Sequence, residues 1–132
     1  MNILAFNAVS DYIKREILHK CKLNLSQTRI LLFFDSTNNR ALTMGTLAKS
    51  MNISLSTLSR QLQQKSTKDL IVISKSDNSS SKSVNLNQAG LAKVTELKSA
   101  LKDIEQDILS KIATKDQQQF ISDLRSLNTV DK

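Results

Sequence analysis

The stretch Leu42–Leu62 places apolar residues at the spacing of two short amphipathic helices joined by a tight turn. Thr43 precedes the first apolar stripe, and its hydroxyl can accept a hydrogen bond from a free amide of a helix's first turn. Asn52 is among the residues best able to adopt the left-handed conformation that ends a helix. Ser54 is then placed to cap the second helix. The pattern predicts a helix-turn-helix.

The second helix of this pair carries its predicted buried stripe on Leu55, Leu58 and Leu62. Its other face has hydroxyls, amides and positive charge but no carboxylate. Arg can pair with guanine, Gln can pair with adenine, and small hydroxyls can bond phosphates or base edges in the major groove. These residue types favour DNA reading, although any solvated helix face rich in Ser and Gln would look similar. The expected contacts are Ser54, Ser56, Thr57, Arg60, Gln61, Gln64 and Lys65.

Two helices are predicted before the helix-turn-helix. Apolar residues recur at helical spacing from Ile3 to Ile17, which predicts a helix that runs to about Lys20. The segment Asn24 to Ser26 breaks this pattern and supplies a cap for a second helix. Because its run Ile30–Phe34 is strongly apolar, we expect the second helix to be buried on most sides.

Two strands and a polar loop are predicted after the helix-turn-helix. Leu70–Ile73 is mostly β-branched, and Val84–Leu86 alternates as a strand does. The loop between them, Ser74–Ser83, is Ser-rich and too long for a tight turn. It fits either a flexible linker or a wing that lies along the DNA backbone. We favour the wing because Lys75 and Lys82 flank the loop.

The C-terminal part of the chain predicts one long and one shorter helix. The long helix runs from Asn87 to about Ala113, and its about 26 residues would reach ~40 Å, longer than a small domain needs for itself. Part of it is therefore expected to pack on a partner. Thr114 is predicted to cap a last helix that ends near Asn128. Together with the N-terminal apolar stripe, this surplus predicts a homodimer.

Composition and charge agree with a mainly helical DNA-binding protein. The chain has no proline and two glycines, so long helices are unhindered. Of the net charge of +7, residues 40–82 hold +5, residues 1–39 hold +2 and residues 83–132 balance. Because phosphate neutralisation drives nucleic-acid binding, a localised excess marks the expected binding face. An anionic membrane would also attract it, but the bulky apolar face of an interfacial helix is missing. No apolar run approaches the ~20 residues of a membrane span.

Catalytic and metal-binding chemistry finds little support. His19 and Cys21 are the single histidine and cysteine, and a spacing of two places them on different faces of a helix. Neither a Cys–His nucleophile pair nor a zinc site is therefore expected, and no glycine-rich phosphate loop is present. We expect no enzymatic activity, no cofactor and no metal. One cysteine fits a reducing cytoplasm, the expected location. Cys21 is read as a small apolar residue, with a redox sensor as the alternative.

The order of helix, helix, helix-turn-helix, wing, long helix and terminal helix resembles the MarR family of winged-helix transcription regulators. The resemblance covers nearly the whole chain. The matching segments are Leu42-Thr43, Leu47-Ala48, Met51-Asn52-Ile53-Ser54, Ser56-Thr57-Leu58-Ser59-Arg60 with Leu62, and Val84-Asn85-Leu86-Asn87-Gln88-Ala89-Gly90.

This resemblance implies a single domain of mainly α class with a small β-hairpin. Residues 1–39 would form N-terminal helices, residues 40–86 the winged helix-turn-helix, and residues 87–132 the C-terminal dimerisation helices. It further implies a dimer on a pseudopalindromic DNA site and, in many such proteins, a response to a small-molecule effector or an oxidant. The recognition helix at about 54–65 would enter the major groove, and the wing at about 74–83 would carry Lys75 and Lys82.

The chain departs from the family pattern at two places. The family's wing usually carries an arginine that enters the minor groove, whereas Asp77-Asn78-Ser79-Ser80 has none. The segment Lys65–Ile71 has extra residues and lacks the family's glycine, so the recognition helix is expected to run longer or end irregularly. The missing arginine leaves one alternative open. The chain could be a winged-helix interaction module, a scaffold or an antagonist of a regulator, that does not bind DNA specifically.

Overall fold

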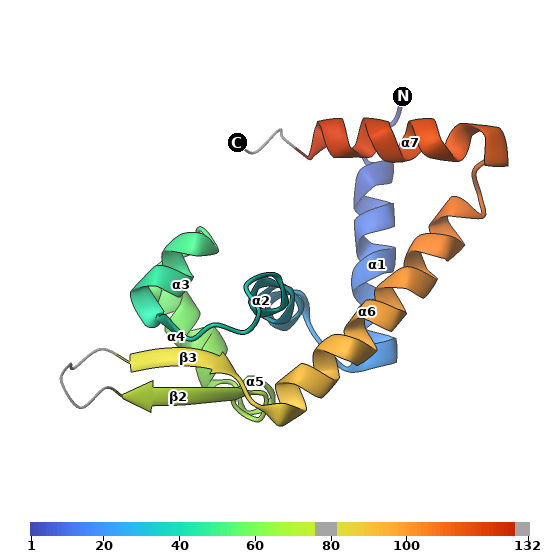
Figure 1. The fold of residues 1–132 in the computed structure, drawn as a ribbon. Coiled ribbons are helices and arrows are strands. Elements are labelled where there is room, and N and C mark those ends of the chain that lie inside the picture. The colour runs from blue at the N-terminus through green and yellow to red at the C-terminus, as the bar shows by residue number, and fades with distance from the viewer. Residues whose placement is uncertain (76–81, 129–132) are drawn as a thin grey trace. The chain divides into compact units, whose positions relative to one another are not determined.

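The computed structural model describes residues 1–75 and 82–128. The expectations for the wing tip, including Asp77 to Ser80, fall outside these residues. The chain divides after Ala100 into two compact units. The elements are α1 (Ala5–Cys21), α2 (Leu25–Ser36), β1 (Leu42–Thr43), α3 (Met44–Ser50), α4 (Leu55–Gln63), α5 (Lys65–Lys68), β2 (Ile71–Lys75), β3 (Lys82–Leu86), α6 (Gln88–Leu109) and α7 (Thr114–Leu127) (Figure 1).

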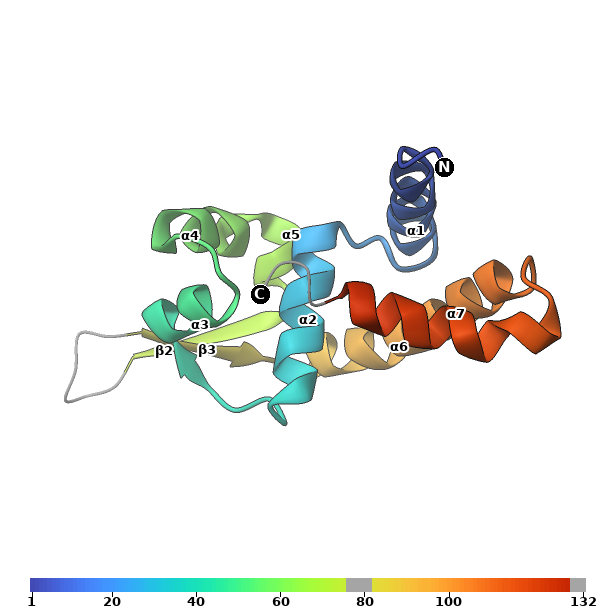
Figure 2. The same ribbon diagram turned by 90° about the horizontal axis from the view of Figure 1, so that it is seen from above.

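Helix α2 is the centre of the unit formed by residues 1–100. It lies between α1 and the α3–α4 pair in both views (Figures 1 and 2). Asn24 begins it with a capping box, because its side chain accepts from the Gln27 amide while the Gln27 side chain accepts from the Asn24 amide. The apolar side chains of Ile30, Leu31 and Phe34 are at most 1% exposed. The prediction that α2 is mostly buried is therefore confirmed.

The predicted β-hairpin is part of a three-stranded antiparallel sheet with the order β1-β3-β2. Strand β1 was not predicted, since its two residues form a strand only by pairing with β3. Asn39 extends that pairing. Its side-chain nitrogen, Nδ2, donates to the Leu86 carbonyl at 3.0 Å, and its side-chain oxygen, Oδ1, accepts from the Leu86 backbone amide at 2.7 Å. Asn39 thus occupies the edge of β3 much as a further strand residue would.

Helix α6 begins where the sequence predicts and ends earlier. The Asn87 side chain accepts from the Gly90 amide at 2.8 Å, which is the bond of an N-cap. The helix stops at Leu109, so its 22 residues span about 33 Å rather than the predicted ~40 Å. In the unit after Ala100, the side-chain nitrogen of Gln117 donates to the backbone carbonyls of Leu109 and Ile112. These bonds satisfy backbone acceptors just past the helix end.

The cap predicted for the last helix is wrong by one residue. Ala113 occupies the cap position of α7 and makes no side-chain cap bond, while Thr114 is already helical. The helix ends at Leu127, as expected from the sequence.

The core of residues 1–100 joins the C-terminal end of α1 to α2, the helix-turn-helix, the sheet and α6. Its buried apolar side chains include Cys21, Phe34, Leu47, Leu58, Leu62, Val84 and Leu97. An ion pair from Lys98 of α6 to Asp35 of α2, 3.0 Å long, lies at its edge. Within the described residues, no helix is both long and apolar enough to cross a membrane.

Candidate nucleic-acid interface

The turn between α3 and α4 has the geometry that the sequence predicts. The Thr43 hydroxyl accepts from the Thr46 amide at 3.2 Å, and the Ser54 hydroxyl accepts from the Thr57 amide at 3.1 Å. Asn52 adopts a φ of 57°, in the left-handed region. Both caps and the predicted turn residue are therefore confirmed. They set the angle between the two helices without a glycine.

The outward face of α4 is polar and positively charged. Leu58 and Leu62 are buried beneath the helix, as predicted. On the opposite side, Ser56 and Arg60 are exposed, and Thr57 is half-exposed. Within the described part of the chain, the ion pairs are Lys93–Glu96 and Lys98–Asp35, so the Arg60 guanidinium has no carboxylate partner there. The guanidinium is therefore free of these carboxylates and can donate hydrogen bonds to a phosphate or to the edge of a guanine.

Two positions on α4 differ from the prediction. Leu55, assigned to the buried stripe, is 54% exposed, so that assignment is wrong. It is the first residue of the helix, and none of the described residues covers it fully. Gln61, expected on the outer face, is half-buried, and its Oε1 is enclosed without a hydrogen-bond partner among the described residues. It borders a hollow of about 250 Å³ that is also lined by Leu25, Ser26, Arg29, Met51 and Ile53.

The recognition helix is shorter than the predicted 54–65. It ends at Gln63, because Gln64 has an extended backbone with a ψ of 132°. Lys65 then begins the one-turn helix α5, which was not predicted. Gln64 and Lys65 are both exposed but lie beyond the recognition helix rather than on it. The extra residues noted in the sequence therefore form an irregular end, which is one of the two outcomes expected.

A buried polar cluster fixes this irregular end to α2. The side-chain nitrogen of Gln27, Nε2, donates to the Ser66 hydroxyl at 2.6 Å and to the Thr67 hydroxyl at 3.2 Å. Gln27 and Thr67 are 3% and 2% exposed. Since a buried amide that loses its partners is costly, these bonds hold the end of α4 in one position relative to α2. A glutamine at the third position of a capping box was the available sequence signal, but its long-range partners were not predictable.

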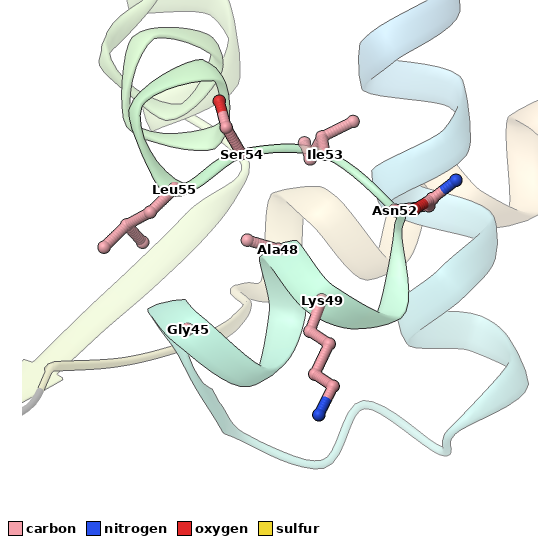
Figure 3. Close-up of a pocket in the computed structure, with 7 residues that line it drawn as sticks. All are labelled: Gly45, Ala48, Lys49, Asn52, Ile53, Ser54 and Leu55. Atoms are coloured by element: carbon pink, nitrogen blue, oxygen red, sulfur yellow. The ribbon is translucent and has the colours of Figure 1, made fainter.

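An open hollow lies beside the helix-turn-helix, between α3 and the start of α4 (Figure 3). Its volume is about 530 Å³. The lining residues are Gly45, Ala48, Lys49, Asn52, Ile53, Ser54 and Leu55. Gly45 and Ala48, the two smallest of these residues, leave the space open towards Leu55, while the Lys49 side chain points away from Leu55 and the Ser54 hydroxyl caps α4.

The two predicted wing lysines lie opposite each other across the hairpin. Lys75 ends β2, Lys82 begins β3, and the strand register pairs them directly. Both side chains are exposed. Like charges at directly opposed positions repel one another, and an anion between them relieves that repulsion. In both views the hairpin, α3 and α4 gather at the end of residues 1–100 that lies away from α1 (Figures 1 and 2).

Cys21 lies in the core rather than at this surface. It is 0% exposed, and its Sγ is 4.0 Å from the Glu96 carbonyl oxygen, to which it donates. Burial, and secondarily the nearby Glu96 carboxylate, raise the pKa of the thiol above its ordinary value. Because the thiolate is the reactive form, this environment suppresses oxidation. Among the residues described, no three His, Cys, Asp or Glu side chains come together as a metal site requires.

We expect the native protein to react slowly with a thiol reagent such as 5,5′-dithiobis(2-nitrobenzoate) at pH 8. In denaturant the same chain should react at once, because unfolding removes the burial that raises the thiol pKa and blocks access. The release of the coloured thiolate measures both rates. Equal rates for the native and unfolded chain would show that Cys21 is open to reagents and would restore it as a candidate redox sensor.

Comparison with known proteins gives likeness in structure without likeness in sequence. No protein-family model matches the chain, and no curated protein matches it. Among solved structures, the MepR–DNA complex from S. aureus covers 100% of this chain and 98% of its own, at a TM-score of 0.76 and 19% identity. A probable transcriptional regulator from Pseudomonas aeruginosa covers 96% of this chain and 97% of its own, at a TM-score of 0.74 and 16% identity.

The heme sensor protein PefR from Streptococcus agalactiae, solved with heme, covers 94% of this chain and 86% of its own, at a TM-score of 0.71 and 17% identity. At these identities the likeness establishes architecture alone. The described helices and the three-stranded sheet therefore form the winged helix-turn-helix fold of these regulators, which is the fold predicted from the sequence.

Proposed function

We propose that the protein is a sequence-specific DNA-binding transcriptional regulator that places α4 in the major groove and the β2–β3 hairpin on the DNA backbone. The observation that carries this proposal is the outward face of α4, which presents hydroxyls and the Arg60 guanidinium and where no carboxylate of residues 1–75 or 82–128 pairs with Arg60. The net charge of +5 on residues 40–82 supports it, because phosphates are the expected counter-charge. The shared fold with MepR, solved as a DNA complex, supports it further.

The proposed contacts follow the geometry. Ser56, Thr57 and Arg60 would meet base edges from α4, and Ser54 would serve mainly as its cap. Exposed Gln64 and Lys65 lie past the helix end, where backbone phosphates are the more suitable partners. Gln61 is proposed as a positioning residue rather than a base contact, since its side chain is half-buried.

Selection of DNA from a random duplex library tests the proposal. We expect the purified protein to enrich a sequence with two-fold symmetry and to bind it at least 1,000-fold more tightly than random duplex, about the lower limit for specific regulators. The alternative is an interaction module that binds no DNA specifically. Enrichment of no sequence, with equal weak binding to every duplex, would favour that alternative and contradict the proposal.

We also propose that the protein acts as a homodimer through its terminal helices. At the start of α1, the apolar residues Phe6 and Val9 of the helix and Ile3 and Leu4 just before it are 46 to 65% exposed. On α7, Leu124 and Leu127 are more than 50% exposed and no residue is buried. Two amphipathic helices whose apolar stripes lie open within one chain are typical of helices that pack on a second copy.

Sedimentation equilibrium should therefore give twice the chain mass of 14.7 kDa at micromolar concentration. Leu124→Asp should shift the equilibrium towards monomer, because a carboxylate cannot be buried unpaired in an apolar interface. Asp123→Ala, a change at the neighbouring exposed position, serves as the control and should leave the mass unchanged. A parent protein that sediments as a monomer would contradict this part of the proposal.

The hairpin lysines are expected to hold DNA through charge and to carry little sequence information. Replacing both Lys75 and Lys82 by Ala should weaken binding to selected and random duplexes by similar factors, because an ammonium neutralises phosphate without reading bases. The slope of log affinity against log salt should fall by about 1 for each lost contact. Fluorescence anisotropy at several salt concentrations measures both effects. Retained binding to random DNA with lost discrimination would show that the hairpin reads sequence.

A small-molecule effector stays a prediction for this chain. PefR, which shares the fold, is described as a heme sensor and was solved with heme, so one protein of this architecture combines the fold with ligand binding.

Chromosomal DNA as the partner would place the protein in the cytoplasm.

A further inference from the structure

Leu55 is an apolar residue on an otherwise polar surface. It is the first residue of α4 and 54% exposed, between Ser54 and Ser56. A single exposed leucine is ordinary on a protein surface and carries no meaning alone. Its position is what matters, because the N-terminal residues of a recognition helix are the ones that reach base edges in helix-turn-helix proteins.

The surroundings of Leu55 leave room for a large partner. Figure 3 shows its side chain extending away from Ile53, at the border of the open hollow of about 530 Å³. Across this hollow stands Gly45, where an added Cβ would find no atom within 4 Å. Ala48 adds only a methyl group to this lining, and the Lys49 side chain points away from Leu55 (Figure 3). A base could therefore approach Leu55 closely.

We propose that Leu55 recognises thymine through contact with its C5-methyl group. This rests on the proposed DNA-binding function and adds to it a residue that reads one base. In the major groove the methyl group is the apolar feature that distinguishes thymine, and cytosine presents an amino group nearby instead. Thr57 of α4 also carries a methyl group, but Leu55 has the largest exposed apolar side chain on this helix. Leu55 supplies the apolar surface that this base needs.

The experiment uses a duplex that the protein itself selects from a random library. Each thymine of one half-site is replaced in turn by uracil, which removes the methyl group and nothing else. We expect at least one replacement to weaken binding of the parent protein about threefold to fivefold, the effect of leaving one methyl-sized apolar group unburied. Leu55→Ala should bind the thymine and uracil duplexes equally.

Leu25→Ala is the matched control. Leu25 is likewise the first residue of a helix, follows an asparagine cap and is 44% exposed. This variant should keep the parent's ratio between thymine and uracil duplexes. Urea unfolding of all three proteins checks that folding is unchanged.

Two results would overturn the inference while leaving the proposed function intact. Either no uracil replacement weakens the parent protein, or Leu55→Ala retains the full thymine preference. Failure to select any duplex would contradict the proposed function itself, and this inference with it.

Discussion

Gly90→Ala is expected to destabilise the protein by about 3 kcal/mol, at the upper end of the usual cost of overpacking. A Cβ at this position would lie 2.2 Å from the Leu70 carbonyl oxygen and 3.0 Å from the Leu86 Cβ. The carbonyl cannot move freely, because it accepts a hydrogen bond from the Asn87 amide at 3.1 Å. The first turn of α6 would therefore have to separate from the base of the hairpin.

Gly45→Ala provides the matched control for this prediction. Gly45 is also helical, but a Cβ there meets no atom within 4 Å. Since alanine is a better helix former than glycine, we expect unchanged or slightly higher stability, by at most about 1 kcal/mol. Urea unfolding at equal protein concentration compares both variants with the parent. If Gly90→Ala unfolded at the parent's midpoint, the close approach of α6 to Leu70 would not exist in the folded protein.

Local chemistry explains what the sequence predicted correctly. Thr43, Asn52 and Ser54 act through hydrogen bonds and backbone angles within three or four residues, so their roles are visible in sequence. The buried positions Leu58 and Leu62 repeat at helical spacing for the same reason. These local signals occur along the chain in the order of a winged helix-turn-helix, and the fold could therefore be predicted from them.

Long-range contacts explain what the sequence did not predict. Strand β1 exists because Leu42 pairs with Val84, a residue 42 positions away. The break at Gln64 is stabilised by bonds from Gln27 to Ser66 and Thr67, which no local pattern announces. The spacing of apolar residues also does not show whether the first residue of a helix is covered by neighbouring elements. Leu55 therefore matched the buried stripe while remaining exposed.

The end of α6 shows the same limit in another form. The apolar spacing continues to Ile112, and neither proline nor glycine marks a stop. The helix ends at Leu109 all the same. The Ser110 hydroxyl bonds to the Asp107 carbonyl, and Gln117 bonds to carbonyls on the other side of the turn. Side chains here replace the backbone bonds that a longer helix would have made.

Arg60→Ala is expected to weaken binding to the selected duplex by about 1 to 3 kcal/mol for each half-site, the usual contribution of a bidentate contact to a base. Folding should be almost unaffected, because Arg60 is exposed and pairs with no carboxylate among the described residues. Anisotropy titrations with selected and random duplexes give the specific and non-specific affinities. Urea unfolding gives the stability.

Arg60→Lys separates charge from geometry at this position. Lysine keeps the positive charge but presents a single ammonium in place of the planar guanidinium. If Arg60 contacts guanine, Arg60→Lys should retain binding to random duplex and lose most of the discrimination that Arg60→Ala loses. If Arg60 contacts phosphate, the lysine variant should instead bind both duplexes nearly as well as the parent does. Equal affinity of Arg60→Ala and the parent for the selected duplex would show that this face of α4 does not meet DNA, and the proposed orientation of the helix would be wrong.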